Sequence, residues 1–92
     1  MTNIKIGNNE VVHFIGIGGI GMSGLAQIMK VMGFNVQGSD VSHGKNIENC
    51  KKIGVRTFIG HNRKNILNAT IIVKSNAITK KNSELIEAKR TK

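Results

Sequence analysis

Short apolar runs rich in β-branched residues alternate along the chain with segments in which apolar residues recur at helical spacing. Such runs are typical of strands buried on both faces of a parallel sheet. We expect strands at residues 11–15, 34–38, 55–59 and 70–73. The spacing predicts helices at residues 22–32, 47–53 and 82–88, and one or two helical turns at residues 63–68. This alternation predicts the α/β fold class, as a Rossmann-like open parallel sheet with helices on both faces.

Local signals mark the ends of two predicted helices. Gly33 follows the first helix, where a residue in the left-handed conformation commonly ends the last turn. Asn82 is expected to cap the last helix, with Glu84 near the positive end of its dipole.

The sequence divides into a short arm and one domain. Residues 1–9 are polar and are expected to form a flexible N-terminal arm, whereas residues 10–92 form the Rossmann-like domain. A chain of 92 residues is too short for two independent domains. No closing strand follows the last helix, so we interpret the sequence as a fragment of a longer protein.

Composition narrows the class of partner. The chain has no Pro, Trp or Tyr and only 3 Phe, so its core must be aliphatic. The net charge is +9, but the Lys and Arg residues are scattered over the predicted helix faces and the tail, without interleaved aromatic residues for base stacking. We therefore expect no nucleic-acid partner, and interpret the charge as solvated surface that favours an anionic small ligand.

The single cysteine and the absence of long apolar runs bear on location. Cys50 cannot form an internal disulfide, and the N-terminus lacks the pattern of a secretory signal. No apolar run approaches the roughly 20 residues needed to cross a bilayer. We expect a cytoplasmic protein without a membrane partner.

A glycine-rich motif, Gly16-x-Gly18-x-x-Gly21, lies between the first predicted strand and the first predicted helix. This is the context that the dinucleotide-type fingerprint requires. N–H groups around Ile20 to Ser23 would face an anion along the positive end of the helix dipole. The motif predicts a pyrophosphate site, and the alternative is a tight strand-to-helix turn. Predicted site residues here are Gly18, Gly19, Ile20, Gly21, Met22 and Ser23.

Polar residues follow the next strands, at the edge where open α/β sheets bind ligands. Asp40 could accept hydrogen bonds from ribose hydroxyls or from the imide N–H of a uracil, or it could cap the turn at Ser42 and His43. His61 could bind the nucleoside or be an exposed loop histidine. His13 lies inside the first strand, where a buried, hydrogen-bonded histidine is the better interpretation.

The segment from Ser75 to Ile78 follows the fourth predicted strand. Its backbone and short polar side chains could contact a sugar or a phosphate, and the alternative is a simple connecting turn. The sequence contains no nucleophile with a paired base, no acid/base carboxylate pair and no G-x-x-x-x-G-K-[ST] loop for ATP. The three histidines and Cys50 lack metal-ligand spacing, so we predict neither catalytic residues nor a metal site.

Several motifs together resemble the Mur ligase family. These are the run from His13 to Gly24, then Val36-x-Gly38-Ser39-Asp40, Phe58-Ile59-Gly60-His61 and Ser75-x-Ala77-Ile78. The resemblance implies an ATP-dependent ligase of three domains that adds L-alanine to UDP-N-acetylmuramate in peptidoglycan synthesis. It also implies that this first domain binds UDP-N-acetylmuramate, while ATP and magnesium belong to the missing central domain and the amino acid to the missing last one.

The resemblance also assigns roles to residues. Gly18 to Ser23 would hold the pyrophosphate. The uridine would face Ser39, Asp40 and His61, and the sugar side would be lined by Ser75, Asn76 and Ala77. Lys74 and Asn76 depart from the family pattern on the sugar side.

Three other functions remain open at this point. A sister Mur ligase that reattaches recycled muramyl tripeptide shares the start of the glycine run, although the continuation Ile20-Gly21-Met22-Ser23 favours the L-alanine ligases. A nicotinamide-dependent oxidoreductase domain would use the same glycines and Asp40. A ligand-sensing module would bind without any chemistry of its own.

Overall fold

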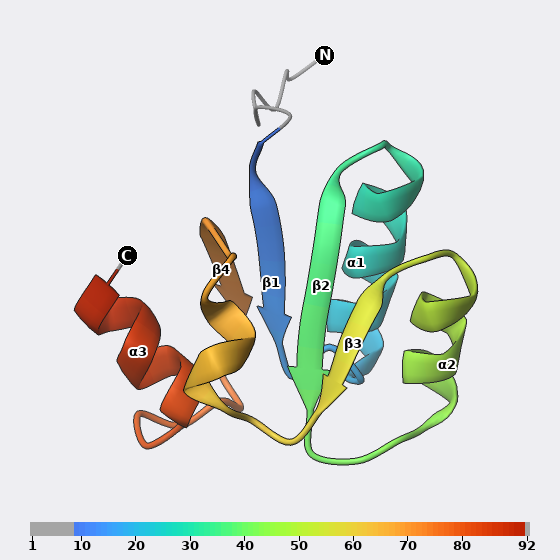
Figure 1. Ribbon diagram of the computed structural model, residues 1–92. Coiled ribbons are helices and arrows are strands. Elements are labelled where there is room, and N and C mark those ends of the chain that lie inside the picture. The colour runs from blue at the N-terminus through green and yellow to red at the C-terminus, as the bar shows by residue number, and fades with distance from the viewer. Residues whose placement is uncertain (1–8, 92) are drawn as a thin grey trace.

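The computed structural model describes residues 9–91. The elements alternate in type along this part of the chain (Figure 1). In order they are β1 (Val11–Ile15), α1 (Ile20–Val31), β2 (Asn35–Asp40), α2 (Lys45–Lys52), β3 (Arg56–Ile59), the 3-10 helix η1 (Arg63–Ile66), β4 (Ile71–Lys74) and α3 (Ser83–Thr91). Of the predicted N-terminal arm, residues 1–8 lie outside the described residues, and Asn9 is exposed.

The four strands form one parallel sheet in the order β3-β2-β1-β4. All four carboxyl ends therefore meet at one edge, the lower edge in Figure 1. The chain builds outward from β1 through β2 to β3 and then returns to add β4 on the other side of β1. This reversal creates a topological switch point beside β1, where open α/β sheets bind ligands.

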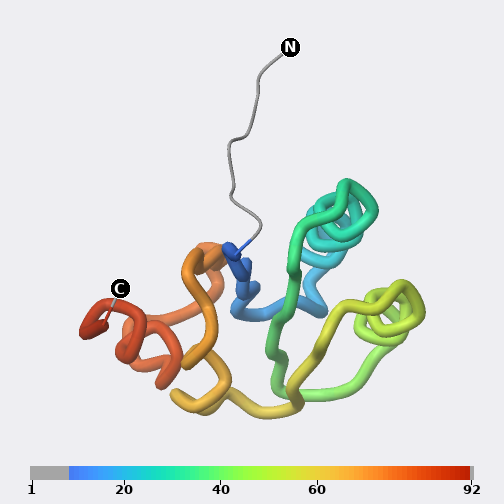
Figure 2. Tube along the Cα trace, turned by 45° about the horizontal axis from the view of Figure 1, so that its top comes forward, coloured from blue at the N-terminus to red at the C-terminus, as the bar shows by residue number. Residues whose placement is uncertain are grey.

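Helices cover both faces of the sheet, as the sequence predicted. Figure 2 shows α1 and α2 on one side of the strands and α3 on the other, with η1 packed against α3. The core under α1 and α2 is apolar and includes Val12, Phe14, Ile17, Ala26, Val36, Ile47, Cys50 and Val55. A smaller apolar cluster under α3 contains Ile66, Ala69 and Ala88.

The predicted elements are confirmed, with shifted boundaries. The main difference is at β2, which continues past Gly38 to Asp40 because Gly38, Ser39 and Asp40 remain paired with β3. Helix α1 begins at Ile20, two positions earlier than the apolar spacing indicated. Gly33 has φ +97°, in agreement with its predicted role as helix terminator.

Candidate functional site

The glycine loop lies at the carboxyl edge of the sheet and is fixed to β2. The N–H groups of Gly16 and Ile17 both donate to the carbonyl oxygen of Ser39, at 2.8 and 2.9 Å. Gly16 has φ +85°, which a residue with a side chain adopts only with strain. The fingerprint glycine therefore makes the sharp turn that starts α1 directly above the end of β2.

The first turn of α1 presents unpaired N–H groups to solvent. The first helical hydrogen bond runs from Ser23 N to Gly19 O at 2.8 Å, so the N–H groups of Ile20, Gly21 and Met22 have no partner within the helix. Gly19, Ile20 and Gly21 are exposed. Three such donors at the positive end of a helix dipole have the geometry and polarity that suit an anion.

Ser23 is not part of that surface. Its N–H is used inside the helix, and its side chain is only 3% exposed, with the hydroxyl donating to Ile20 O at 3.3 Å. The expectation that free N–H groups extend to Ser23 is corrected accordingly, because both its N–H and its hydroxyl are bonded within the first turn of α1.

Asp40 holds the glycine loop from the end of β2. Its Oδ2 accepts a hydrogen bond from Gly18 N at 2.8 Å, and its Oδ1 accepts one from Val41 N at 2.7 Å. The alternative in which Asp40 caps the turn at Ser42 and His43 is therefore wrong. The carboxylate instead satisfies an N–H of the glycine loop, so Gly18 is already paired.

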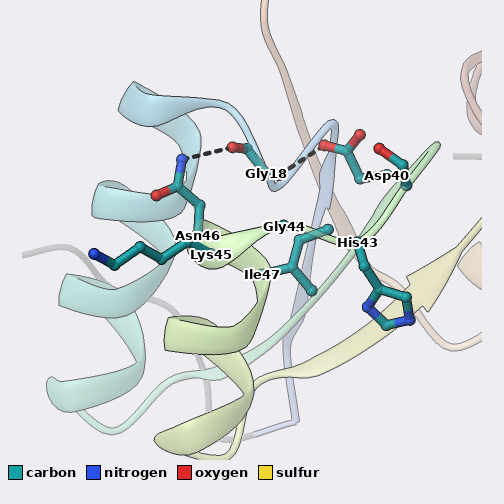
Figure 3. A pocket seen from close by; sticks show the side chains of 8 residues that line it. Gly18, Asp40, His43, Gly44, Lys45, Asn46 and Ile47 are labelled. Atoms are coloured by element: carbon teal, nitrogen blue, oxygen red, sulfur yellow. Dashed lines mark hydrogen bonds between the residues drawn. The ribbon is translucent and has the colours of Figure 1, made fainter.

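A pocket of about 200 Å³ opens next to this contact (Figure 3). The start of α2 forms its second wall, and Asn46 Nδ2 donates to Gly18 O at 2.8 Å. Figure 3 shows Asp40 and Asn46 both bonded to Gly18. The lining residues are Gly18, Asp40, Ser42, His43, Gly44, Lys45, Asn46 and Ile47.

Sequence reasoning missed the contribution of α2 to this pocket. Asn46 and Lys45 lie at the start of an amphipathic segment, where polar residues are ordinary and carry no sequence signal. Only the fold brings this helix start beside the loop after β1.

A buried carboxylate, that of Glu84 at the start of α3, lies beneath Ser39 and His61. Its Oε1 accepts hydrogen bonds from His13 Nε2 at 2.7 Å and from the Ser39 hydroxyl at 2.6 Å. Its Oε2 accepts from Asn65 Nδ2 at 2.7 Å and from Asn62 N at 3.0 Å. A fully buried carboxylate with four donors connects α3 to β1, β2 and the segment after β3.

These contacts decide the charge state of Glu84. Burial by itself raises the pKa of the carboxyl group, but the hydrogen bonds from His13, Ser39, Asn65 and the backbone of Asn62 outweigh it. The pKa is lowered from 4.5 to about 2. Glu84 is therefore ionised at neutral pH, although sequence analysis had given it only a helix-dipole role.

His61 lies at the edge of this network and is partly exposed. Its Nδ1 is 2.9 Å from Ser39 Oγ and 3.7 Å from Glu84 Oε2. Ser39 itself is fully buried, so the residue expected to face a uridine lies underneath His61 and supports it. His13 is also fully buried and hydrogen-bonded, which confirms the interpretation made from its place in the strand.

The segment after β4 forms a turn beside the glycine loop. Ile78 N donates to Ser75 O at 3.1 Å, and Ala77 N donates to Ser75 Oγ at 3.3 Å. A Cβ at Gly16 would lie 3.1 Å from Ile78 Cδ1, so the two segments are in contact. Asn76 and Ala77 are exposed at the carboxyl edge of β4.

The described residues contain no group of three or more His, Cys, Asp or Glu side chains that could hold a metal ion. Within residues 9–91, every helix is too short or too polar to cross a membrane. Across the site as a whole, the residues predicted from the sequence lie at one edge of the sheet, around backbone N–H donors and polar side chains.

The chain is similar to known proteins over nearly its whole length. A family model described as "Mur ligase family, catalytic domain" matches residues 11–92. The protein "UDP-N-acetylmuramate--L-alanine ligase" of Pelagibacter ubique is 62% identical over 86 residues, which are 94% of this chain and 18% of that protein. A protein of the same name from Methylorubrum extorquens is 51% identical over 78 residues, 85% of this chain and 17% of its own length.

Two crystal structures share the fold. The UDP-N-acetylmuramate-alanine ligase MurC of Thermotoga maritima superposes with a TM-score of 0.82 at 32% identity, over 86% of this chain and 18% of that one. The UDP-N-acetylmuramate:L-alanyl-gamma-D-glutamyl-meso-diaminopimelate ligase of Neisseria meningitides gives a TM-score of 0.74 at 29% identity, over 86% of this chain and 25% of that one. The chain therefore corresponds to a small part of each of these proteins.

Proposed function

The chain belongs to the Mur ligase family, and from this membership we propose that it is the UDP-N-acetylmuramate-binding domain of an ATP-dependent ligase. The ligase would add L-alanine to UDP-N-acetylmuramate in peptidoglycan synthesis. The names of the relatives from Pelagibacter ubique and Methylorubrum extorquens support the choice of substrate and amino acid.

The observation that carries the proposal is the exposed first turn of α1 at the switch point of the sheet. The N–H groups of Ile20, Gly21 and Met22 have no helical partner, and no side chain at Gly19 or Gly21 obstructs their approach to a ligand. Donors at the positive end of a helix favour a diphosphate over a neutral group. We assign the pyrophosphate to this turn, with Gly18 and Gly19 giving the close backbone approach.

The nucleoside and the sugar would lie on either side of this turn. Asp40 ends β2 and His61 follows β3, so both are placed for the uridine, and Ser39 acts through His61 because it is buried. Ser75, Asn76 and Ala77 follow β4 on the opposite side of β1, where the sugar would extend. With its diphosphate at α1, a UDP-sugar would direct its uridine towards Asp40 and His61 and its sugar towards the segment after β4.

The chain's own residues bind and orient but do not transfer a group. The sequence lacks the G-x-x-x-x-G-K-[ST] loop that holds a triphosphate, and the chain covers 18% of the relative from Pelagibacter ubique. The proposal therefore places ATP and magnesium in other domains of a longer protein. The proposal includes a cytoplasmic location for this ligase.

Calorimetric titration of the purified chain tests the proposal. We expect saturable binding of UDP-N-acetylmuramate, weaker binding of UDP, and no response to NAD. The matched control is UMP, which keeps the uridine but lacks the second phosphate that α1 would bind. NAD binding without UDP-N-acetylmuramate binding would instead identify a nicotinamide-dependent domain and overturn the proposal.

A further inference from the structure

We propose that Glu84 is a positioning residue which, through Ser39, fixes His61 in the tautomer that carries its hydrogen on Nδ1. The exposed Nε2 of His61 is then a hydrogen-bond acceptor directed at the ligand. The assignment of a ligand to this edge rests on the proposed function, whereas the hydrogen on Nδ1 follows from the hydrogen-bond network, and in a neutral ring it leaves Nε2 without one.

The direction of each hydrogen bond follows from what the partners can do. An ionised carboxylate only accepts, so at 2.6 Å from Glu84 Oε1 the Ser39 hydroxyl must donate. A hydroxyl has one hydrogen, and this contact uses it. Ser39 Oγ can therefore only accept from His61 Nδ1, 2.9 Å away, and that nitrogen must carry a hydrogen.

A second chain of hydrogen bonds, from Gln37 through His13, ends at Glu84 and holds its carboxylate in place. The donor in each of these bonds can also be identified. The carbonyl oxygen of Asn65 only accepts, so the Gln37 atom 2.7 Å away must be the amide nitrogen. The same nitrogen donates to His13 Nδ1 at 2.7 Å, which leaves the hydrogen of His13 on Nε2, facing Glu84 at 2.7 Å. The carboxylate thus receives donors from every side and cannot rotate away from Ser39.

The other nitrogen of His61 is available to a ligand. In residues 9–91, every buried side-chain nitrogen or oxygen has a hydrogen-bond partner. His61 Nε2 has no partner among these residues, so it is at the surface. A neutral imidazole with its hydrogen on Nδ1 presents a lone pair there.

The acceptor character restricts the chemistry of the group that His61 recognises. A phosphate oxygen is itself an acceptor and gains nothing from this nitrogen. A nucleoside hydroxyl or imide N–H would donate to it. We therefore assign His61 to the nucleoside of the ligand, with the diphosphate left to the N–H groups of α1.

Nitrogen NMR of the ¹⁵N-labelled 92-residue chain at neutral pH tests the tautomer in the wild type. We expect the Nδ1 resonance of His61 in the range of protonated imidazole nitrogens and the Nε2 resonance in the unprotonated range. A hydrogen on Nε2, whether in the other neutral tautomer or in an imidazolium, would overturn the inference. No variant is needed, so folding of a mutant cannot obscure this result.

A binding cycle with UDP tests the positioning role. We expect Ser39→Ala to release the tautomer preference and weaken UDP binding roughly three- to tenfold, because only molecules in the acceptor tautomer bind well. In a His61→Ala background the same change should have no further effect. The control, Thr70→Val, removes a hydroxyl that bonds to Val11 at the opposite end of the sheet and should leave UDP binding and the His61 resonances unchanged.

The two proposals fail in different ways. An equal loss of affinity from Ser39→Ala with and without His61 would show a merely structural effect and overturn the positioning role. Absence of binding of both UDP-N-acetylmuramate and UDP in the wild type would overturn the proposed function, while the NMR result would still decide the tautomer. UDP binding with the hydrogen of His61 on Nε2 would retain the proposed function and reject the inference.

Discussion

Gly38, in the middle of β2, allows the glycine loop to lie against the sheet. A Cβ built there would be 2.5 Å from Ile17 Cδ1, 2.7 Å from Ile17 Cβ and 2.8 Å from Phe14 O. One of these contacts is with backbone, which cannot move aside as a flexible side-chain end can. The absence of a side chain at Gly38 therefore sets how closely the loop after β1 approaches β2.

We expect Gly38→Ala to lower the free energy of unfolding by about 1 to 3 kcal/mol or more, as overpacking of a closed core does. Chemical denaturation measures the change. The control is Gly24→Ala in α1, where a Cβ meets nothing within 4 Å. Because alanine favours a helix over glycine, that variant should gain roughly 0.5 to 1 kcal/mol. The account would be contradicted if Gly38→Ala left the free energy of unfolding unchanged, or if both variants changed it by the same amount in the same direction.

Glu84 makes stability depend on pH at the acidic end. Its folded pKa of about 2 lies below the ordinary value of 4.5, so its contribution is complete above the unfolded value and is lost as the pH falls through the folded one. We expect wild-type stability to decline between about pH 5 and pH 2, with up to about 3 kcal/mol from this group. Denaturation curves across this range provide the measurement.

Glu84→Gln should be less stable at neutral pH and should lose most of this acid dependence. Glu48 on α2 offers a matched control, since its side chain is half exposed and its ion pair is with Lys51 on the same helix. Glu48→Gln should retain the wild-type pH profile. An unchanged slope in Glu84→Gln would show that the buried carboxylate does not control acid stability.

At the scale of elements, α3 is fixed by its first turn. Asn82 Oδ1 accepts hydrogen bonds from Glu84 N at 2.9 Å and from Leu85 N at 3.2 Å, as its predicted role as N-cap requires. The same turn holds the Glu84 carboxylate under the sheet edge. The start of this helix therefore couples a local capping signal to the polar network beneath His61.

We expect Asn82→Ala to cost about 1 kcal/mol of stability, because two N–H groups of the helix lose their acceptor. Asn82→Ser retains a capping oxygen and should cost much less. Thermal or chemical denaturation compares the two variants. Equal losses from alanine and serine would indicate that the effect of Asn82 comes from packing and not from its hydrogen bonds.

At the scale of the whole molecule, the ligand edge is assembled from loops that follow all four strands. The pocket wall comes from α2, the unpaired N–H donors from α1, and the support for His61 from α3. A bulky side chain at the centre of this edge should therefore impair binding before it impairs the fold.

Gly18 is the position for that test. A Cβ there would lie 2.7 Å from Asp40 Oδ2 and 3.3 Å from Ile47 Cγ1. We expect Gly18→Val to reduce UDP-N-acetylmuramate binding below detection while the circular dichroism spectrum stays largely native. Gly24→Val, at an open position of α1, is the control and should bind normally. Wild-type affinity in Gly18→Val would show that the diphosphate does not bind beside Gly18.

The periodicity of the sequence was sufficient to predict the strands, the helices, the parallel sheet and the glycine turn. These features depend on neighbouring residues: burial pattern sets the strand, and the positive φ of Gly16 and Gly33 needs no distant contact to be recognised. Asn82 as a cap and His13 as a buried histidine follow from equally local reasoning, and both are confirmed.

Tertiary structure alone decided which distant residues meet. Glu84 contacts His13 and Ser39 across long stretches of sequence, and Asp40 pairs with the N–H of Gly18. No periodicity encodes such pairs, because a carboxylate near a helix start has the same local pattern whether it faces water or a buried network. The strand order and the placement of the helices determine which polar groups come within hydrogen-bonding distance of Glu84. Because a buried polar group without a partner is costly, these groups then pair specifically.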